Sequence, residues 1–243
     1  MFFDDALRDL PRAILLDMDG TLADSEEWWY QAETEIMADL GAIWSKEYVA
    51  QIVGSSLEYA TSKIVSDFDL SISPSELGAR LVSRVCEIGE ASEVPWRPGA
   101  YELLALTVEL GIPTALVTSS YERFARIVID DAPAGSLTTL VAGDHGLPGK
   151  PDPAPYLRAA ELTGAAPETS VVIEDSIFGV RSGMAARAHV VYVPYMVEVA
   201  EAPGLIRVDS LESIDEAALR RFMSVELPQG DPYSQGVRDS EGP

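Results

Sequence analysis

Two aspartates, Asp17 and Asp19, stand one residue apart at the end of the apolar run RAILLDMD (12–19), directly before a glycine. In a strand, side chains two positions apart point to the same face, so these carboxylates would share a small volume. Like charges held this close repel each other unless a cation lies among them. The spacing therefore predicts a metal-binding site at the end of this strand, with acid–base chemistry beside it.

Further polar residues follow the other apolar runs of the chain. They are Thr118, Ser119 and Ser120 at the end of 113–120, Lys150 after 136–143, and Glu174 and Asp175 at the end of 170–176. In an open α/β sheet, ligands bind in the crevice beyond the carboxyl ends of the strands, so we expect these side chains to converge. Four carboxylates in one crevice favour a hard divalent cation, and Mg²⁺ commonly takes carboxylate oxygens together with water and substrate phosphate.

The elements that must position these residues alternate regularly along most of the chain. Short apolar runs of this kind are typical of strands buried on both faces of a parallel sheet. The pattern predicts strands within 12–19, 113–120, 136–143, 170–176 and 189–194, and helices over 100–111, 122–131, 153–164 and 178–188. We therefore expect an α/β fold with a doubly wound, Rossmann-like parallel sheet.

Residues 24 to about 92 interrupt this alternation, because they read as consecutive helices. Asp24 and Glu27 are placed to form a capping box for the first of them, and Ser73 with Glu76 for a later one. We expect a catalytic core formed by 1–22 and 96–228, a small helical domain inserted at 23–95, and a disordered tail at 229–243.

Composition limits the partners of the chain. Of its 243 residues, 40 are acidic and 17 basic, which gives a formal net charge of −23. Such a field repels nucleic acid and anionic membrane surfaces, so we expect neither as a partner. It also repels small phosphates, so a phosphate site here needs its own positive charge. Lys150, one of three lysines in the chain, is placed to supply it.

Other features of the sequence predict a cytoplasmic protein. Cys86 is the single cysteine, so no intramolecular disulfide can form, and we expect it to be a buried thiol. The first residues lack the basic and apolar regions of a signal peptide, and no run of about 18 apolar residues is present.

The motifs DMDGT, VTSS, GKPDP and IEDS occur in the order and spacing of the four motifs of the haloacid dehalogenase superfamily. The sequence resembles that superfamily over roughly residues 12–195. The helical insert resembles its C1 cap, and DGTLADSE resembles the β-phosphoglucomutase-like subgroup. The resemblance implies phosphotransfer on a Rossmann-like core beneath a cap.

The resemblance also implies a role for each motif residue. Asp17 would attack phosphorus and form an aspartyl-phosphate, while Asp19 would protonate the leaving oxygen and then take a proton from water. Mg²⁺ would be held by Asp17, the main-chain carbonyl of Asp19 and Asp175, with Glu174 in or near its coordination shell. The phosphoryl oxygens would be held by Thr118, the Ser119 backbone and Lys150.

Residues that differ from those used in other reactions of the superfamily narrow the range of activities expected of this chain. Dehalogenases of the superfamily lack the second aspartate, so Asp19 favours a phosphate ester over a haloacid. The phosphonate hydrolases use a cap lysine close after the first motif, and neither Lys46 nor Lys63 stands there. We expect a Mg²⁺-dependent phosphatase for a small phosphorylated metabolite, a sugar or polyol phosphate, acting as a monomer or weak homodimer.

Three alternatives stay open. A sugar phosphomutase of the subgroup needs cationic cap residues, and the matching positions hold Trp29, Val53 and Leu57, which argues against that reaction. A phosphoacceptor receiver-type signalling module uses similar residues, but it has no inserted helical domain. A catalytically inactive binding module is disfavoured because every chemical residue of the four motifs is present.

Overall fold

The structure, a computed structural model, describes residues 9–49, 51–52, 55–228 and 232–233. Its centre is a six-stranded sheet in the order β3-β2-β1-β4-β5-β6, in which every neighbouring pair is parallel. The strands are β1 (Ala13–Leu16), β2 (Thr114–Val117), β3 (Thr139–Val141), β4 (Ser170–Glu174), β5 (His189–Tyr192) and β6 (Leu205–Arg207). The expected doubly wound parallel sheet is confirmed.

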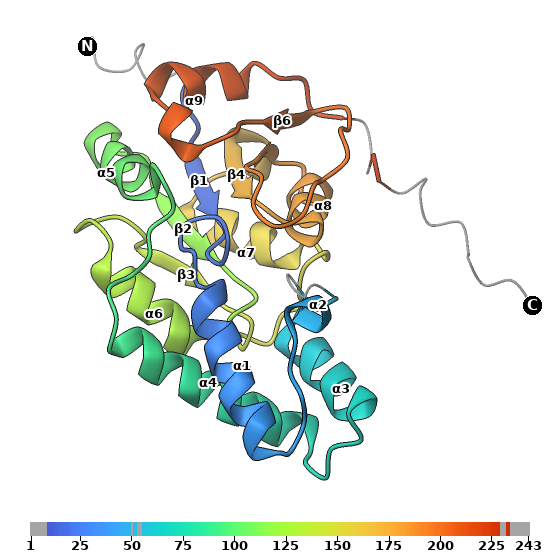
Figure 1. The fold of residues 1–243 in the computed structure, drawn as a ribbon. Helices are drawn as coiled ribbons and strands as arrows, with labels where there is room; N and C mark the ends of the chain where they lie inside the picture. Colours follow the sequence, from blue (N-terminus) through green and yellow to red (C-terminus); the bar gives the residue numbers. More distant parts are fainter. Residues whose placement is uncertain (1–8, 50, 53–54, 229–231, 234–243) are drawn as a thin grey trace, which may run out of the picture.

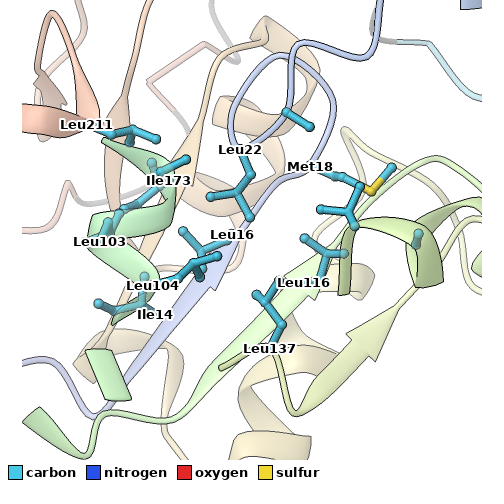
Figure 2. Close-up of a cluster of buried hydrophobic side chains, with 14 of the residues drawn as sticks. Ile14, Leu16, Met18, Leu22, Leu103, Leu104, Leu116, Leu137, Ile173 and Leu211 are labelled. Carbon is cyan, nitrogen blue, oxygen red and sulfur yellow. The ribbon is translucent and has the colours of Figure 1, made fainter. Parts of the chain in front are cut away.

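Alternate residues of each central strand face opposite sides of the sheet, so the sheet has a hydrophobic cluster on each face. Ile14 and Leu16 of β1 pack on one side with Leu103 and Leu104 (Figure 2). Leu15, on the other side, belongs to the second cluster. Both faces are apolar, which is why these strands read as continuous hydrophobic runs.

Helices cover both faces. The first cluster receives residues of α5 (Ala100–Leu110), α6 (Glu122–Asp131) and α9 (Glu216–Met223), and the second receives residues of α7 (Ala154–Thr163) and α8 (Ile177–Ala185). Short 3₁₀ helices lie at Pro167–Thr169 and Leu211–Ser213. The layers are therefore helix, sheet and helix, with the crossovers on either side of the parallel strands.

The inserted segment forms a group of helices at the end of the molecule remote from β6 and α9, and it packs against α6 of the core (Figure 1). They are α1 (Glu26–Asp39), α2 (Lys46–Val49), α3 (Leu57–Asp67) and α4 (Pro74–Glu90). A third hydrophobic cluster joins them, with Met37, Ile64 and Leu77 at its centre. We call this group the cap helices. The domain boundaries at 22/23 and 95/96 stay a prediction.

Several local predictions are decided by the structure. The cap of α4 is confirmed, because the Ser73 hydroxyl accepts a hydrogen bond from the Glu76 amide at 3.1 Å. The capping box at Asp24 and Glu27 is wrong. The residue that precedes α1 is Ser25, whose backbone is helical and not extended as in most capping residues, and its side chain makes no capping hydrogen bond.

Other expectations differ from the structure or fall outside it. Strand β6 and helix α9 are present although the sequence pattern did not predict them. Cys86 is buried, as expected. The predicted disordered tail at 229–243 falls largely outside the described residues, and so does Val53. Within the described part of the chain, no helix combines the length and apolar character that a bilayer crossing requires.

Candidate active site

Acidic residues from two strands meet at the carboxyl end of the sheet. Asp17 directly follows β1, and its amide donates to the carbonyl of Ile173 at 3.1 Å, which holds it beside β4. Glu174 ends β4 and Asp175 follows it. One oxygen from each of the three carboxylates lies within 4.8 Å of the others, and all three residues are buried. Residues about 160 positions apart in the sequence are therefore brought together, as expected.

Lys150 is the cation of this cluster. Its Nζ donates to Asp17 Oδ1 at 2.5 Å, to Glu174 Oε1 at 2.6 Å and to the Val117 carbonyl at 2.9 Å. The side chain is only 4% exposed. Burial alone would lower the pKa of Lys150, but the charges of Asp17 and Glu174 outweigh it and hold that pKa above its ordinary value. The lysine is therefore a fixed positive charge beside Asp17.

Both oxygens of Glu174 are already occupied by donors of the chain. Oε1 accepts from Lys150 and from the Tyr156 hydroxyl at 2.6 Å. Oε2 accepts from the Ser176 hydroxyl at 3.1 Å and from the amides of Asp175 and Ser176. A carboxylate held by this many donors is fixed in position. In this arrangement Glu174 orients Lys150.

The Asp19 carboxylate is held by three hydroxyl groups. Ser25 donates to Oδ1 at 2.5 Å, while Thr118 and Ser120 donate to Oδ2 at 3.1 and 2.8 Å. Ser25 lies at the start of the cap helices and the other two follow β2. Asp19 is thus oriented from the cap side and from the core side at once.

A glycine turn permits the close approach of Asp175 to the first motif. Gly20 has a φ of +84°, a conformation that favours glycine, and a Cβ at this position would lie 2.3 Å from Asp175 Oδ2. The Thr21 hydroxyl donates to Asp175 Oδ1 at 3.3 Å. The Gly-Thr pair after Asp19 therefore seats the Asp175 carboxylate against the loop.

The cluster fits a divalent cation. Burial, followed by the charge of Glu174, raises the pKa of Asp17 to about 7, and burial followed by the charge of Asp17 raises the pKa of Asp175. Three carboxylates and one ammonium carry two uncompensated negative charges. Asp17 Oδ2 and Asp175 Oδ2 accept no hydrogen bond from the described residues. An oxygen donor set with this charge suits Mg²⁺.

A cavity of about 300 Å³ opens over the cluster. Asp17, Asp19, Ser119, Lys150 and Asp175 line its floor, and the rest is lined by residues of the inserted segment together with core residues that include Phe178 and Met196. Thr118 lies on an adjoining cavity, to which Ser119 and Lys150 also contribute. The structure thus places all the predicted site residues around one region, while the role of each stays a prediction.

Sequence reasoning gave no role to three side chains that position the site. Ser120 was expected in the crevice, as a further hydroxyl at the end of the same strand, but its contact with Asp19 was not predicted. Ser25 was hidden by an apparent helix start, where a serine ordinarily caps the helix. Tyr156 lies in α7 and reads as a core residue, which it also is, since its ring is fully buried. None of these hydrogen bonds follows from spacing in the sequence.

Known proteins are similar to this chain over most of its length. A family model described as haloacid dehalogenase-like hydrolase matches residues 14–193. Hexitol phosphatase A of Escherichia coli strain K12 is 32% identical over 92% of this chain and 99% of its own length. Phosphoglycolate phosphatase of Thiobacillus denitrificans is 28% identical, over 76% of this chain and 83% of its own.

Solved structures resemble the fold closely. CbbY from Rhodobacter sphaeroides, determined in complex with phosphate, has a TM-score of 0.79 at 25% identity, and the match covers 86% of this chain and 99% of that one. β-Phosphoglucomutase from Clostridium difficile has a TM-score of 0.77 at 17% identity, covering 88% of this chain and 98% of that one, which is a likeness of fold.

Proposed function

Because this chain belongs to the haloacid dehalogenase-like hydrolases, we propose that it is a Mg²⁺-dependent phosphatase for a small phosphorylated metabolite, a sugar or polyol phosphate. The observation that carries the proposal is the contact between Lys150 and Asp17, at 2.5 Å, on the floor of a cavity that Asp19 also lines. A nucleophile, its charge partner and a proton-transfer group then face one bound ester.

In the first step the Asp17 carboxylate attacks phosphorus, and the bond between phosphorus and the alcohol oxygen breaks as the aspartyl-phosphate forms. Lys150 Nζ stabilises the negative charge on the transferring phosphoryl oxygens while it keeps Asp17 in place. Ser119 lines the same floor, where its backbone amide binds phosphoryl oxygens. Glu174 acts through Lys150 as a positioning residue.

Asp19 transfers the protons. It protonates the departing alcohol oxygen, then removes a proton from the water that attacks the aspartyl-phosphate. Inorganic phosphate leaves and the Asp17 carboxylate is restored. Ser25, Thr118 and Ser120 fix the Asp19 carboxylate by their hydroxyl groups, so its geometry is set before substrate arrives.

Asp17, the main-chain carbonyl of Asp19 and Asp175 would hold Mg²⁺, which when bound neutralises charge on the phosphoryl group. We assign residues 23–95 as a cap that covers the substrate and excludes bulk water, and 1–22 with 96–228 as the catalytic core. Helix packing supports this division, since the cap helices have their own hydrophobic cluster.

Hydrolysis is favoured over mutase chemistry by the walls of the cavity. A mutase retains a phosphorylated sugar during two transfers and uses cationic cap residues for this purpose. Trp29 and Leu57, at two of those positions, line the cavity as apolar residues. The third position, Val53, lies outside the described residues and bears no charge.

The proposal extends to the setting of the enzyme. We propose a monomer or weak homodimer in the cytoplasm, supported by the single cysteine, which leaves no intramolecular disulfide to maintain. The net charge of −23 supports a small metabolite rather than a polyanion as the partner. Size-exclusion chromatography with light scattering checks the oligomeric state.

A phosphate-release screen tests the function. The protein is incubated with a panel of phosphorylated metabolites in Mg²⁺ and in chelator, with Asp17→Asn as the control variant. We expect release in Mg²⁺ alone and none from the variant. Release that persists in chelator or in Asp17→Asn contradicts the mechanism. An isomerised product without free phosphate supports the mutase, and phosphorylation by a histidine kinase without hydrolysis supports the receiver.

A further inference from the structure

The cavity above the catalytic cluster has two chemically different ends. Its floor holds the carboxylates, Ser119 and Lys150, which face the phosphate. Its far end lies among the cap helices, where Trp29, Ile64 and Leu81 contribute apolar walls. A phosphate ester that places its phosphorus over Asp17 must therefore project its alcohol part into the capped end.

Two carboxyl groups of the cap helices line the cavity, and Glu26 lies near enough to Asp19 for their charges to interact. Glu26 and Glu33 both belong to α1 and lie seven residues apart, about two helical turns, so they face the same side. Glu33 is nine-tenths buried; its Oε2 accepts from Trp44 Nε1 at 3.0 Å, and its Oε1 has no partner among the described residues. The Glu26 side chain likewise accepts no hydrogen bond within the described part of the chain.

No cation balances these carboxyls at the capped end. Among the described residues, Lys150 is the single Lys, Arg or His that lines the cavity, and it stands on the floor beside Asp17. The positions between Val49 and Ser55 that the structure leaves undescribed are Ala50, Val53 and Gly54, and none of these residue types carries a charge. The two cap lysines lie elsewhere, where Lys46 pairs with Glu27 and Lys63 with Asp67.

The raised pKa values of the two carboxyl groups suit them to bind hydroxyl groups of a substrate. Burial, followed by the charge of Asp19, raises the pKa of Glu26 to about 8, and burial raises the pKa of Glu33 to about 7. A carboxyl that shares a proton both donates and accepts hydrogen bonds, which matches the hydroxyls of a polyol. Near neutral pH a fraction of each carboxyl is ionised, so a second anionic group at this place would be repelled by that charge and would meet no cation to balance its own.

We propose that Glu26 and Glu33 select phosphate monoesters whose alcohol part is uncharged and bears hydroxyl groups, and that they exclude monoesters with a second carboxylate or phosphate. This inference rests on the proposed phosphatase function and specifies its substrate class. It separates two activities found among similar proteins, because a hexitol phosphate carries an uncharged polyol and phosphoglycolate carries a carboxylate.

The test compares kcat/KM for three probes in Mg²⁺: sorbitol 6-phosphate, 2-phosphoglycolate and phosphoethanolamine. The unsubstituted protein should prefer sorbitol 6-phosphate to 2-phosphoglycolate by about 100-fold. In Glu26→Gln, Glu33→Gln and the double variant, that preference should fall by about tenfold or more, mainly because 2-phosphoglycolate becomes a better substrate. Circular dichroism and thermal melting establish that each variant is folded.

Glu27→Gln is the matched control. Glu27 neighbours Glu26 in α1, but its side chain is 74% exposed and pairs with Lys46 outside the cavity, so the substrate preference should not move. The inference is overturned if the preference persists in both folded single variants and the double variant, if 2-phosphoglycolate is the better substrate of the unsubstituted protein, or if phosphoethanolamine is preferred to sorbitol 6-phosphate. Failure to hydrolyse any monoester instead overturns the proposed function on which the inference rests.

Discussion

Gly179 lies directly over the Glu174 carboxylate, so closely that a Cβ on residue 179 would stand 1.7 Å from Glu174 Oε1. That oxygen accepts from Lys150 and Tyr156. Any side chain at position 179 must therefore displace the carboxylate that orients the lysine. The first turn of α8 and the charge network of the site are built as one unit.

We predict that Gly179→Ala lowers kcat by about 100-fold or more, because Lys150 loses the partner that holds it beside Asp17. Steady-state kinetics measures the loss, and thermal melting measures the accompanying instability. The matched variant is Gly183→Ala, one turn further along α8. Its Cβ would lie 3.0 Å from Val172 and Val190, so it should cost about 1–3 kcal/mol of stability with little change in kcat. Equal losses of kcat in both folded variants would contradict this assignment.

Glu174 and Asp175 are adjacent acids that we expect to behave differently towards Mg²⁺. Both carboxylate oxygens of Glu174 accept hydrogen bonds from other groups of the chain, whereas Asp175 Oδ2 accepts none from the described residues. Asp175→Asn should raise the Mg²⁺ concentration for half-maximal activity by about tenfold or more. Glu174→Gln should lower kcat with a much smaller change in that concentration. Titrations of activity with Mg²⁺ separate the two, and the reverse pattern would make Glu174 a metal ligand.

The hydroxyl of Ser25 donates to Asp19 Oδ1 at 2.5 Å. A residue of the inserted segment therefore helps to orient Asp19, the group proposed to transfer protons. Ser25→Ala should lower kcat by about 10- to 100-fold with little effect on KM, because Asp19 stays present but loses its orientation. Ser120→Ala, on the other oxygen, should have an effect of similar size. Ser73→Ala removes only the cap of α4 and serves as the control. An unchanged kcat in Ser25→Ala would remove Ser25 from the mechanism.

The sequence predicted the sheet and the position of the chemistry because both depend on short-range patterns. Buried parallel strands are unbroken apolar runs, and the polar residue that follows such a run stands at the edge where ligands bind. This is why Asp17 and Lys150 were correctly expected near each other across 133 positions. Strand β6 was missed because it has three residues, half-buried or exposed, and so carries no apolar run.

The hydrogen bonds that support the site could not be predicted, because a serine or aspartate that precedes a helix can either cap that helix or bind a distant side chain. Ser25 precedes a helix, where a serine ordinarily caps it, and nothing nearby in the sequence shows that Asp19 takes its hydroxyl. Asp24 was likewise expected to cap α1, yet its carboxylate accepts from the Tyr195 hydroxyl, 171 positions away. Such choices depend on tertiary proximity, which local patterns do not encode.

Glu33 gives a prediction that depends on stability rather than on activity. Burial raises the pKa of its carboxyl from 4.5 to about 7, so the native state binds this proton more tightly than the unfolded chain does. The contribution of the protonated group to stability is complete below pH 4.5, is lost as the pH rises towards 7, and is absent at higher pH. A glutamine cannot ionise and can still accept the hydrogen bond from Trp44.

Glu33→Gln should therefore be more stable than the unsubstituted protein at pH 8, by up to about 3 kcal/mol, and nearly equal to it at pH 4.5. Urea unfolding at several pH values measures the difference, which should grow across this interval and then level off. Glu27→Gln provides the comparison, since the exposed Glu27 side chain should give no such pH-dependent gain. A difference that is constant with pH would mean that Glu33 is ionised in the folded protein throughout, and the buried end of the cavity would then carry a full negative charge.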